Sequence, residues 1–94
     1  MFYCYILFSP LLESYYVGIT SEAVINRLEK HNNHSYGSKY TAKTDDWEIY
    51  LEIICVTLSQ SLKIEKHIKK MKSKVYINNL KLYPEIIEKL LLKF

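Results

Sequence analysis

The order of hydrophobic and polar positions along the chain predicts three β-strands. Residues 2–8 are aromatic, β-branched or otherwise apolar throughout, so we expect a strand that is buried on both faces. A turn at residues 9–13, which contains Pro10, leads into a second strand over residues 14–19, and the two strands form a hairpin. Residues 47–56 alternate at first and are then wholly apolar, which predicts the third strand.

Alternation along the second strand separates its side chains into two sets. Tyr16 and Gly18 share one face, and Tyr15, Val17 and Ile19 share the other. A glycine near the end of a strand indicates that another group approaches the backbone closely there. The ordinary explanation of this stretch is a strand tyrosine in the core and a glycine in a turn.

Apolar residues recur at helical spacing between and after the strands. Residues 20–32 carry Val24 and Leu28 one turn apart, and the hydroxyl and acidic residues at 20–22 predict the start of this helix. A second helix runs to about Lys72, with Thr57 or Ser59 as its N-cap. Its predicted apolar stripe comprises Leu62, Ile64, Ile68 and Met71.

The C-terminal part of the chain continues this helical pattern. Residues 75–80 predict another short helical turn, and a final helix begins around Pro84 and ends in residues 90–94. The element order is therefore ββαβαα. This order predicts an α+β fold in which helices flank a three-stranded antiparallel sheet.

Length and composition indicate one globular domain, residues 1–94, with a small core. No uncharged apolar run approaches the roughly 20 residues that span a bilayer. The first residues lack the basic segment of a signal peptide, so we expect a cytoplasmic protein without membrane contact. Cys4 and Cys55 lie in apolar runs and are expected to be free thiols.

Charge is distributed unevenly along the chain. The net charge is +3, but residues 63–94 alone carry nine lysines and three glutamates. Such a basic segment favours a polyanionic partner, of which nucleic acid is the commonest, although a solvated lysine-rich helix has the same composition. The chain has twelve lysines and a single arginine, Arg27, which suggests a task such as bidentate phosphate recognition that lysine performs poorly.

Five side chains are candidates for chemistry, and each also has an ordinary structural explanation. Tyr5 and Tyr16 on the hairpin can be core tyrosines, and Arg27 can be a solvated helical residue. His31, one turn after Arg27, can be a polar residue that favours the C-terminal end of its helix. Glu65, at the margin of the buried face of the second helix, has Lys69 four residues on and can form an ion pair with it.

Short motifs in a fixed order connect these candidates. They are Tyr-Cys-Tyr at residues 3–5, Tyr-Val-Gly at 16–18, the segment that contains Arg27 and His31 at 27–32, the loop at 37–41, and the segment around Glu65 at 64–73. Their order and separations resemble the GIY-YIG nuclease family over nearly the whole chain. The resemblance is closest to the small stand-alone bacterial members, which are related to the N-terminal nuclease of the bacterial excinuclease.

Two positions depart from the family pattern. Tyr3 stands where the family has the glycine of its GIY motif. Many members also have an asparagine near the C-terminus, for which Asn78 and Asn79 are both candidates here. Neither departure removes a charged group from the predicted site.

The resemblance implies the GIY-YIG endonuclease fold and a metal-dependent endonuclease that hydrolyses DNA phosphodiester bonds. It implies a structure-specific enzyme of the repair or recombination type, with Mg²⁺ or Mn²⁺ as cofactor and no small-molecule cofactor. Glu65 would be the metal ligand, and Arg27 would clamp the scissile phosphate. Tyr5 would orient or deprotonate the attacking water, and Tyr16 would hydrogen-bond the same water or the phosphate.

A free phenol has a pKa of about 10 and is a poor base at neutral pH, so a neighbouring group must assist. His31 and Lys39 are the candidates for that assistance. The predicted nucleic-acid-binding residues, which would follow the phosphate backbone independently of sequence, are Lys39, Lys66, Lys69, Lys70 and Lys72.

Two other classes of function remain open from the sequence. One is a non-catalytic nucleic-acid-binding module of the same fold, and the other is an interaction protein whose lysine-rich helix is merely solvated. A protein partner or a homodimer has no support in the sequence. The nuclease interpretation requires that Tyr5, Tyr16, Arg27 and Glu65 converge on one cleft.

Overall fold

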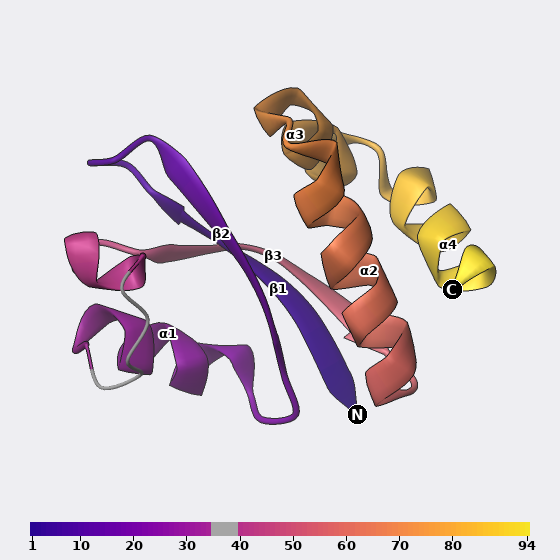
Figure 1. Ribbon diagram of the computed structural model, residues 1–94, viewed down its shortest axis with the longest axis horizontal. Coiled ribbons are helices and arrows are strands. Elements are labelled where there is room, and N and C mark those ends of the chain that lie inside the picture. Colours follow the sequence, from indigo (N-terminus) through magenta and orange to yellow (C-terminus); the bar gives the residue numbers. More distant parts are fainter. Residues whose placement is uncertain (35–39) are drawn as a thin grey trace.

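Three antiparallel strands form one sheet that lies between helices (Figure 1). The computed structural model describes residues 1–34 and 40–94. This architecture confirms the predicted α+β fold class and element order. The elements are β1 (Phe2–Ser9), β2 (Ser14–Thr20), α1 (Val24–Asn32), the 3₁₀ helix η1 (Thr41–Lys43), β3 (Glu48–Cys55), α2 (Leu58–Met71), α3 (Lys74–Leu82) and α4 (Pro84–Lys93).

β1 is the central strand, and the strand order is β2-β1-β3. Its register places Tyr5 opposite Gly18 of β2 and opposite Glu52 of β3. The four residues from Cys4 to Leu7 are completely buried, which confirms that this strand is covered on both faces. Because β2 lies at an edge of the sheet, its outer side is open to contacts from other elements.

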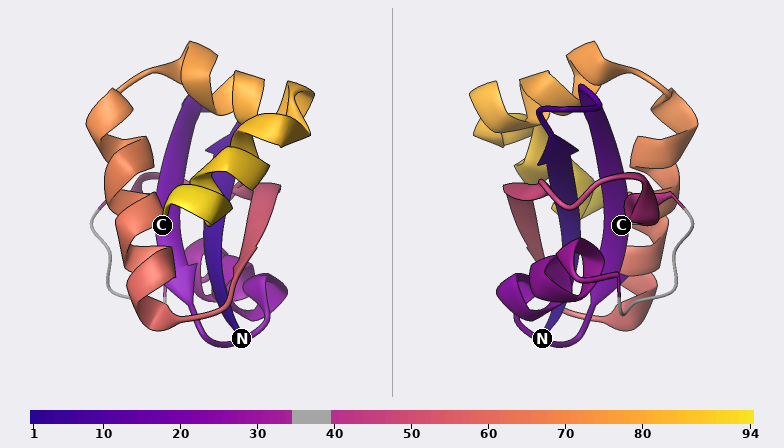
Figure 2. Two further views of the ribbon diagram at one scale, coloured as in Figure 1. Left: turned by 90° about the vertical axis from the view of Figure 1, so that its right-hand side faces the viewer. Right: turned by 90° about the vertical axis from the view of Figure 1, so that its left-hand side faces the viewer.

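The two faces of the sheet carry separate hydrophobic clusters, and Figure 2 shows the helices in front of each face in turn. α1 and η1 lie on one face, where Tyr5, Leu7, Val24 and Trp47 are buried. α2, α3 and α4 lie on the other face, where residues of the strands and of these three helices form one hydrophobic cluster. Its buried residues are Cys4, Ile6, Val17, Ile53, Cys55, Ile64, Ile68, Ile77, Leu80 and Leu90.

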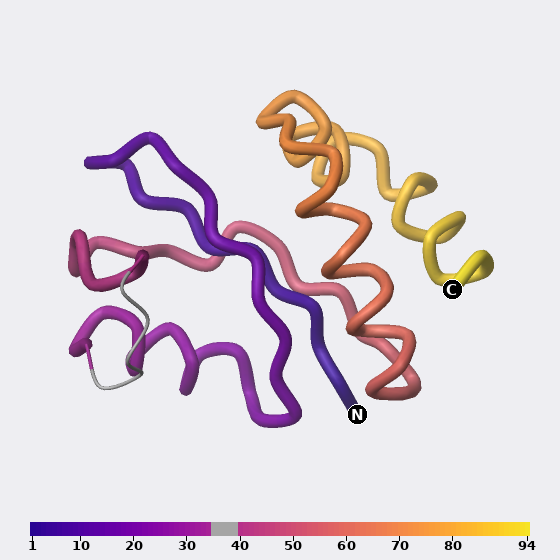
Figure 3. The backbone as a smooth tube through the Cα atoms, in the orientation of Figure 1, coloured from indigo at the N-terminus to yellow at the C-terminus, as the bar shows by residue number. Residues whose placement is uncertain are grey.

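The start of α1 differs from the prediction. The N-cap position is Ala23, which has no side-chain acceptor, and the predicted hydroxyl cap at residues 20–22 is wrong. Thr20 is instead the last residue of β2, and its Oγ1 accepts a hydrogen bond from the backbone N–H of Glu22. Pairing with β1 therefore holds Thr20 in the strand, and α1 follows after a short turn (Figure 3).

The buried stripe of α2 also differs in part. Thr57 is the N-cap, as one of the two predicted alternatives, and Ile64 and Ile68 are buried. Leu62 and Met71 are each 45 % exposed, so their assignment to the stripe is wrong. Ser61 takes the third buried position, three residues before Ile64; Leu62 falls outside this helical spacing, and Met71 is the last residue of the helix.

The C-terminal helices extend the predicted pattern. The short helical turn expected at residues 75–80 is a complete helix, α3, with Ser73 as its N-cap. Pro84 begins α4, as predicted. Among the described residues, no helix is both long and apolar enough to cross a membrane.

Candidate active site

A buried chain of hydrogen bonds joins β1, α1 and η1. The Tyr5 hydroxyl lies 2.9 Å from Nε2 of His31, and Nδ1 of the same ring lies 2.9 Å from Oγ1 of Thr41. Tyr5 and His31 are completely buried, and Thr41 is almost completely buried. Either neutral tautomer of the imidazole satisfies both bonds, because each hydroxyl can donate or accept.

Gly18 makes room for this arrangement. It faces Tyr5 across the β1–β2 pair, and a Cβ atom at position 18 would lie 2.6 Å from the Tyr5 hydroxyl oxygen and 2.7 Å from Cζ. Such distances are well inside van der Waals contact. The group that approaches the backbone of β2 is therefore the phenol of Tyr5, which the sequence pattern did not identify.

His31 is held in its neutral form. Burial lowers the pKa of this imidazole from 6.5 to about 4, and the positive charge of Arg27 contributes to this lowering. Arg27 lies one turn earlier on α1, is half-buried, and has a buried Nε atom. The lone guanidinium of the chain therefore lies beside the Tyr5–His31 pair, as the i, i+4 spacing predicted.

The end of α1 is fastened to the start of β3 by residues that the sequence pattern did not single out. The side-chain amide of Asn32 donates to the carbonyl oxygen of Trp47 and accepts from its backbone N–H. The indole N–H of Trp47 donates to the carbonyl oxygen of Thr41. Asn32 and Thr41 are the last residues of two of the short motifs, and Trp47 is the only tryptophan in the sequence. Motif membership and this uniqueness are the signals by which the sequence could have identified the three residues.

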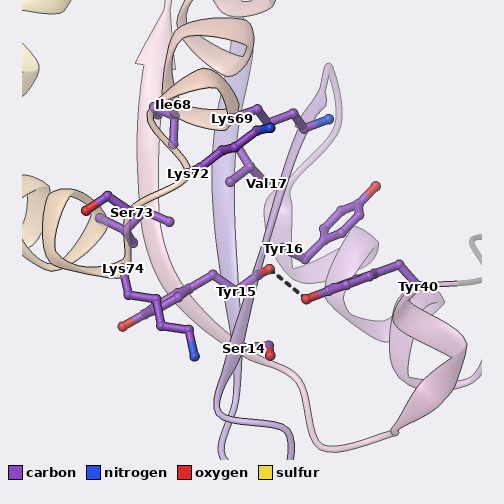
Figure 4. Close-up of a pocket in the computed structure, with 11 residues that line it drawn as sticks. Ser14, Tyr15, Tyr16, Val17, Tyr40, Ile68, Lys69, Lys72, Ser73 and Lys74 are labelled. Atoms are coloured by element: carbon purple, nitrogen blue, oxygen red, sulfur yellow. Dashed lines mark hydrogen bonds between the residues drawn. The ribbon is translucent and has the colours of Figure 1, made fainter.

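Tyr16 lies at the boundary between this buried chain and the surface. Its ring centroid is 4.9 Å from that of His31 and 6.3 Å from that of Tyr5, and the residue is half-buried. It also lines a cavity of about 520 Å³ between β2 and the end of α2, together with Tyr40, Lys69 and Lys72 (Figure 4). Tyr16 thus contacts the buried histidine on one side and an open cavity on the other.

Glu65 belongs to α2, on the other face of the sheet. Its side chain is 19 % exposed, and its carboxylate accepts a hydrogen bond of 3.2 Å from Lys69. Burial raises the pKa of the Cys4 thiol, and the charges of Cys55 and Glu65 add to this rise. Glu65 therefore lies near Cys4, which pairs with Ile19 of β2.

The direction of α2 gives a second indication of where Glu65 lies along β2. Lys69 lines the cavity with Tyr16 and Val17, and Lys74 at the start of α3 donates to the carbonyl oxygen of Glu13 just before β2. α2 thus runs antiparallel to β2. Four helical residues rise about 6 Å, the length of roughly two strand residues, so Glu65 lies level with about Gly18 or Ile19.

The structure brings the predicted site residues together in two groups. Tyr5, Tyr16, His31 and Arg27 gather on the α1 face of the sheet. Glu65 stands on α2, where its ion-pair partner Lys69 shares the cavity with Tyr16. The cavity lies at the β2 edge between these groups, but Tyr5, Arg27 and Glu65 do not line it, so the expected convergence of these three residues with Tyr16 on one cleft is not met in this cavity.

The predicted nucleic-acid-binding lysines separate onto two flanks of α2. Lys69 and Lys72 line the cavity beside Tyr16. Lys66 and Lys70 lie on the opposite flank, in a smaller hollow of about 300 Å³ with Lys63 and Phe94. Lys39 falls outside the described residues.

The two asparagine candidates lie on α3. Asn78 accepts a hydrogen bond of 2.9 Å from the Tyr50 hydroxyl of β3, the strand at the opposite edge from β2. Asn79 is half-buried. Asn78 is thus engaged at the far side of the sheet from Tyr16.

A metal ion would find few protein ligands here. The described residues contain no group of three or more His, Cys, Asp or Glu side chains that could hold one. Glu65 offers one partly exposed carboxylate. A single carboxylate fits Mg²⁺, which typically binds through one or two carboxylates and completes its shell with water and substrate phosphate.

The fold thus places a tyrosine pair across β1 and β2 and an arginine and a histidine on α1 on one face of the sheet. Residues 1–81 match the sequence model of the GIY-YIG catalytic domain, and the chain belongs to this family. It is a family of nucleases, which are hydrolases that generally use divalent metal ions, and DNA is the substrate that such a domain indicates. Comparisons with curated proteins and with solved structures gave no significant match.

Proposed function

We propose that this protein is a structure-specific endonuclease that hydrolyses DNA phosphodiester bonds with Mg²⁺ or Mn²⁺. The observation that carries the proposal is the buried hydrogen bond between Tyr5 and His31, with Tyr16 and Arg27 beside it, in a GIY-YIG catalytic domain. A phenol, an imidazole and a guanidinium on one face of the sheet supply the groups that phosphate hydrolysis needs.

Tyr16 is the tyrosine that meets the substrate in this proposal. Tyr5 is completely buried, so the predicted direct contact between Tyr5 and the attacking water has no support in its surroundings. Tyr16 is half-buried and lines the cavity, and its hydroxyl would orient the water that attacks phosphorus. Tyr5 is then a positioning residue that acts through His31.

His31 has the same kind of role. An imidazole whose pKa is about 4 stays neutral at pH 7 and is a weak base. It therefore fixes the Tyr5 hydroxyl and packs against Tyr16 rather than storing the proton of the water. Its neutrality also leaves Arg27 as the positive charge beside the tyrosine pair, where it would stabilise the charge that builds up on the phosphate.

Glu65 would hold the metal ion. The bound ion would lower the pKa of a coordinated water and neutralise phosphate charge. Lys69 holds one of the two carboxylate oxygens, and phosphate entering the cavity would offer that ammonium a second anionic partner. Lys69 and Lys72 would bind the phosphates nearest the cut, and Lys66 and Lys70 on the opposite flank of α2 would contact phosphates farther along the strand.

A non-catalytic nucleic-acid-binding module is the second candidate. The specific observation that favours it is the ion pair of Glu65 with Lys69, which occupies the only carboxylate proposed for the metal. Such a module would bind DNA with the same salt dependence and would not cleave it.

For either function we propose a cytoplasmic location, because Cys4 and Cys55 are both free and buried.

A cleavage screen over flaps, junctions, nicked duplexes and damaged duplexes, with and without Mg²⁺, tests the proposal. We expect the parent protein to cut at least one of these DNAs only when Mg²⁺ is present. Arg27→Ala and Glu65→Gln should each abolish cleavage and leave the fold and the DNA affinity nearly unchanged. Glu88→Gln, an exposed glutamate of α4, is the matched control for Glu65→Gln and should cut like the parent.

Two outcomes would contradict the proposal in different ways. If Glu65→Gln cleaves as well as the parent, the metal ligand is wrong, although the nuclease activity stands. If the parent binds every DNA in a salt-dependent manner and cuts none of them with Mg²⁺ or Mn²⁺, the non-catalytic module replaces the nuclease.

A further inference from the structure

The cavity beside Tyr16 extends away from the candidate active site along the outer edge of β2. It is bordered by β2 from Ser14 to Val17, by Tyr40 before η1, and by the end of α2 with the start of α3. Its volume of about 520 Å³ falls within the range of roughly 300–1,000 Å³ that is usual for ligand sites. The residues that border it differ in character from one side to the other.

One side of the cavity is aromatic. The rings of Tyr16 and Tyr40 are nearly parallel, at 28°, with centroids 6.1 Å apart. The Tyr40 hydroxyl donates a 3.3 Å hydrogen bond to the carbonyl oxygen of Tyr15, which fixes the ring against the edge of β2 (Figure 4). Tyr40 is nevertheless 39 % exposed, and the ammonium of Lys43 lies 5.1 Å from its ring centroid. An exposed, fixed aromatic ring can stack with a flat partner.

The other side of the cavity is basic. Lys69 on α2, Lys72 at its C-terminal end and Lys74 at the start of α3 all border the cavity. The bond of Lys74 to the carbonyl oxygen of Glu13 keeps this side close to the start of β2. No carboxylate is among the described residues that line the cavity. Phosphate groups that lie along this side would therefore meet three lysine side chains, of which Lys69 is also ion-paired with Glu65.

We propose that this cavity holds an unpaired strand of the nucleic acid, continuing from the scissile phosphate along the edge of β2. The proposal rests on the nuclease function and names the class of its substrate: DNA with a single-stranded segment next to the cut. A base must be unstacked from its neighbours to lie on Tyr40, which an unpaired strand allows and a continuous duplex does not. A strand that stacks its bases on one side places its phosphates on the other, where the lysines lie.

Binding measured without cleavage tests the cavity directly. The probes are a labelled, unstructured oligothymidine and a hairpin duplex of equal length, with a chelator present, over a range of salt concentrations. Tyr40→Ala should weaken binding of the oligothymidine about five- to tenfold and leave binding of the duplex unchanged. Tyr40→Phe keeps the ring and loses the bond to Tyr15 that fixes it, so it should bind the oligothymidine more tightly than Tyr40→Ala does and at most as tightly as the parent.

A matched pair of lysine substitutions tests whether the charge beside the cavity contributes to binding. Lys72→Ala should reduce the slope of log affinity against log salt for the oligothymidine by about 0.7, the value of one phosphate contact with a single strand. Lys63→Ala removes the same charge from the opposite flank of α2 and should leave the slope unchanged. Equal slopes for Lys72→Ala, Lys63→Ala and the parent would overturn the proposal, even if Tyr40→Ala failed to fold.

Cleavage separates this proposal from the function on which it rests. If the parent cuts DNA that has a single-stranded arm faster than a nicked duplex, and Tyr40→Ala loses this preference, both proposals stand. If the parent cuts DNA and neither Tyr40→Ala nor Lys72→Ala changes binding or preference, the cavity proposal is wrong and the nuclease function stands. If nothing is cut but binding of the oligothymidine still depends on Tyr40 and Lys72, the nuclease function is wrong and the cavity proposal stands.

Discussion

Mild acid is expected to destabilise this fold through His31. The imidazole is completely buried, and its pKa is about 4, chiefly because of burial and secondly because of the charge of Arg27. In the unfolded chain the same group has its ordinary pKa of 6.5. Between these two values the unfolded state binds more protons than the folded state. The stability contributed by His31 is therefore complete above pH 6.5 and is lost as the pH falls towards 4.

The size of this effect follows from the two pKa values. Between pH 7.5 and pH 5, linkage gives a loss of about 2 kcal/mol in the free energy of unfolding, and about 3 kcal/mol below both pKa values. This is a large part of the stability of a domain of this size, which is typically about 5–15 kcal/mol. Hydroxyl hydrogen bonds from Ser9 and Thr44 lower the pKa of Asp46, so that carboxylate loses its contribution only at more acidic pH.

Urea unfolding of the parent and of His31→Gln, at several pH values between 7.5 and 5, measures the effect. His31→Gln is expected to be less stable at pH 7.5, because the bonds to Tyr5 and Thr41 change, but its stability should vary much less with pH. Arg27→Gln removes the second cause of the lowered His31 pKa, so it should reduce the dependence of the free energy of unfolding on pH in part. If the parent and His31→Gln lose the same free energy over this range, His31 is not the group responsible, and a neutral histidine at the site is refuted.

Two further predictions follow from single contacts. Gly18→Ala should cost about 1–3 kcal/mol in the free energy of unfolding, measured by urea titration, because its Cβ would lie 2.6 Å from the hydroxyl oxygen of Tyr5; stability equal to that of the parent would show that the phenol moves freely. Lys69→Met removes the ammonium that pairs with Glu65, so half-maximal cleavage should need less Mg²⁺ in a metal titration at saturating DNA, which compensates for the lost phosphate contact; an increased requirement would contradict the proposed role of Glu65 as the metal ligand.

The sequence predicted those parts of the fold for which the pattern of apolar positions has only one structural explanation. A segment that is apolar on both faces has to be a central strand, and β1 is central. Alternation separated Tyr16 from Tyr15 and Val17, and the two sets do pack on opposite faces of the sheet. The assignment of residues 1–94 to one domain stays a prediction, since the family match ends at residue 81.

Other features depended on contacts between distant residues, which no local pattern contains. The buried stripe of α2 was wrong in part because Leu62 and Ile64 are equally apolar, and only the position of the sheet decides which is covered. The spacing of Arg27 and His31 indicated that they are neighbours. The bond from His31 to Tyr5 spans 26 residues and the bond to Thr41 spans ten, so no local pattern could show that the histidine is buried between two hydroxyls.

The position of β2 at the edge of the sheet determines how the proposed groups can cooperate. Tyr16 packs on the α1 face at this edge and Arg27 belongs to α1, whereas Glu65 stands on a helix that covers the other face. Groups on opposite faces can reach one phosphate only around an outer strand, and β2 is that strand. The relative placement of the arginine and the glutamate therefore depends on β2 remaining paired with β1. Substitutions that loosen this pairing should reduce cleavage before they unfold the domain, because they would separate the proposed phosphate clamp from the proposed metal ligand while both helices remain packed.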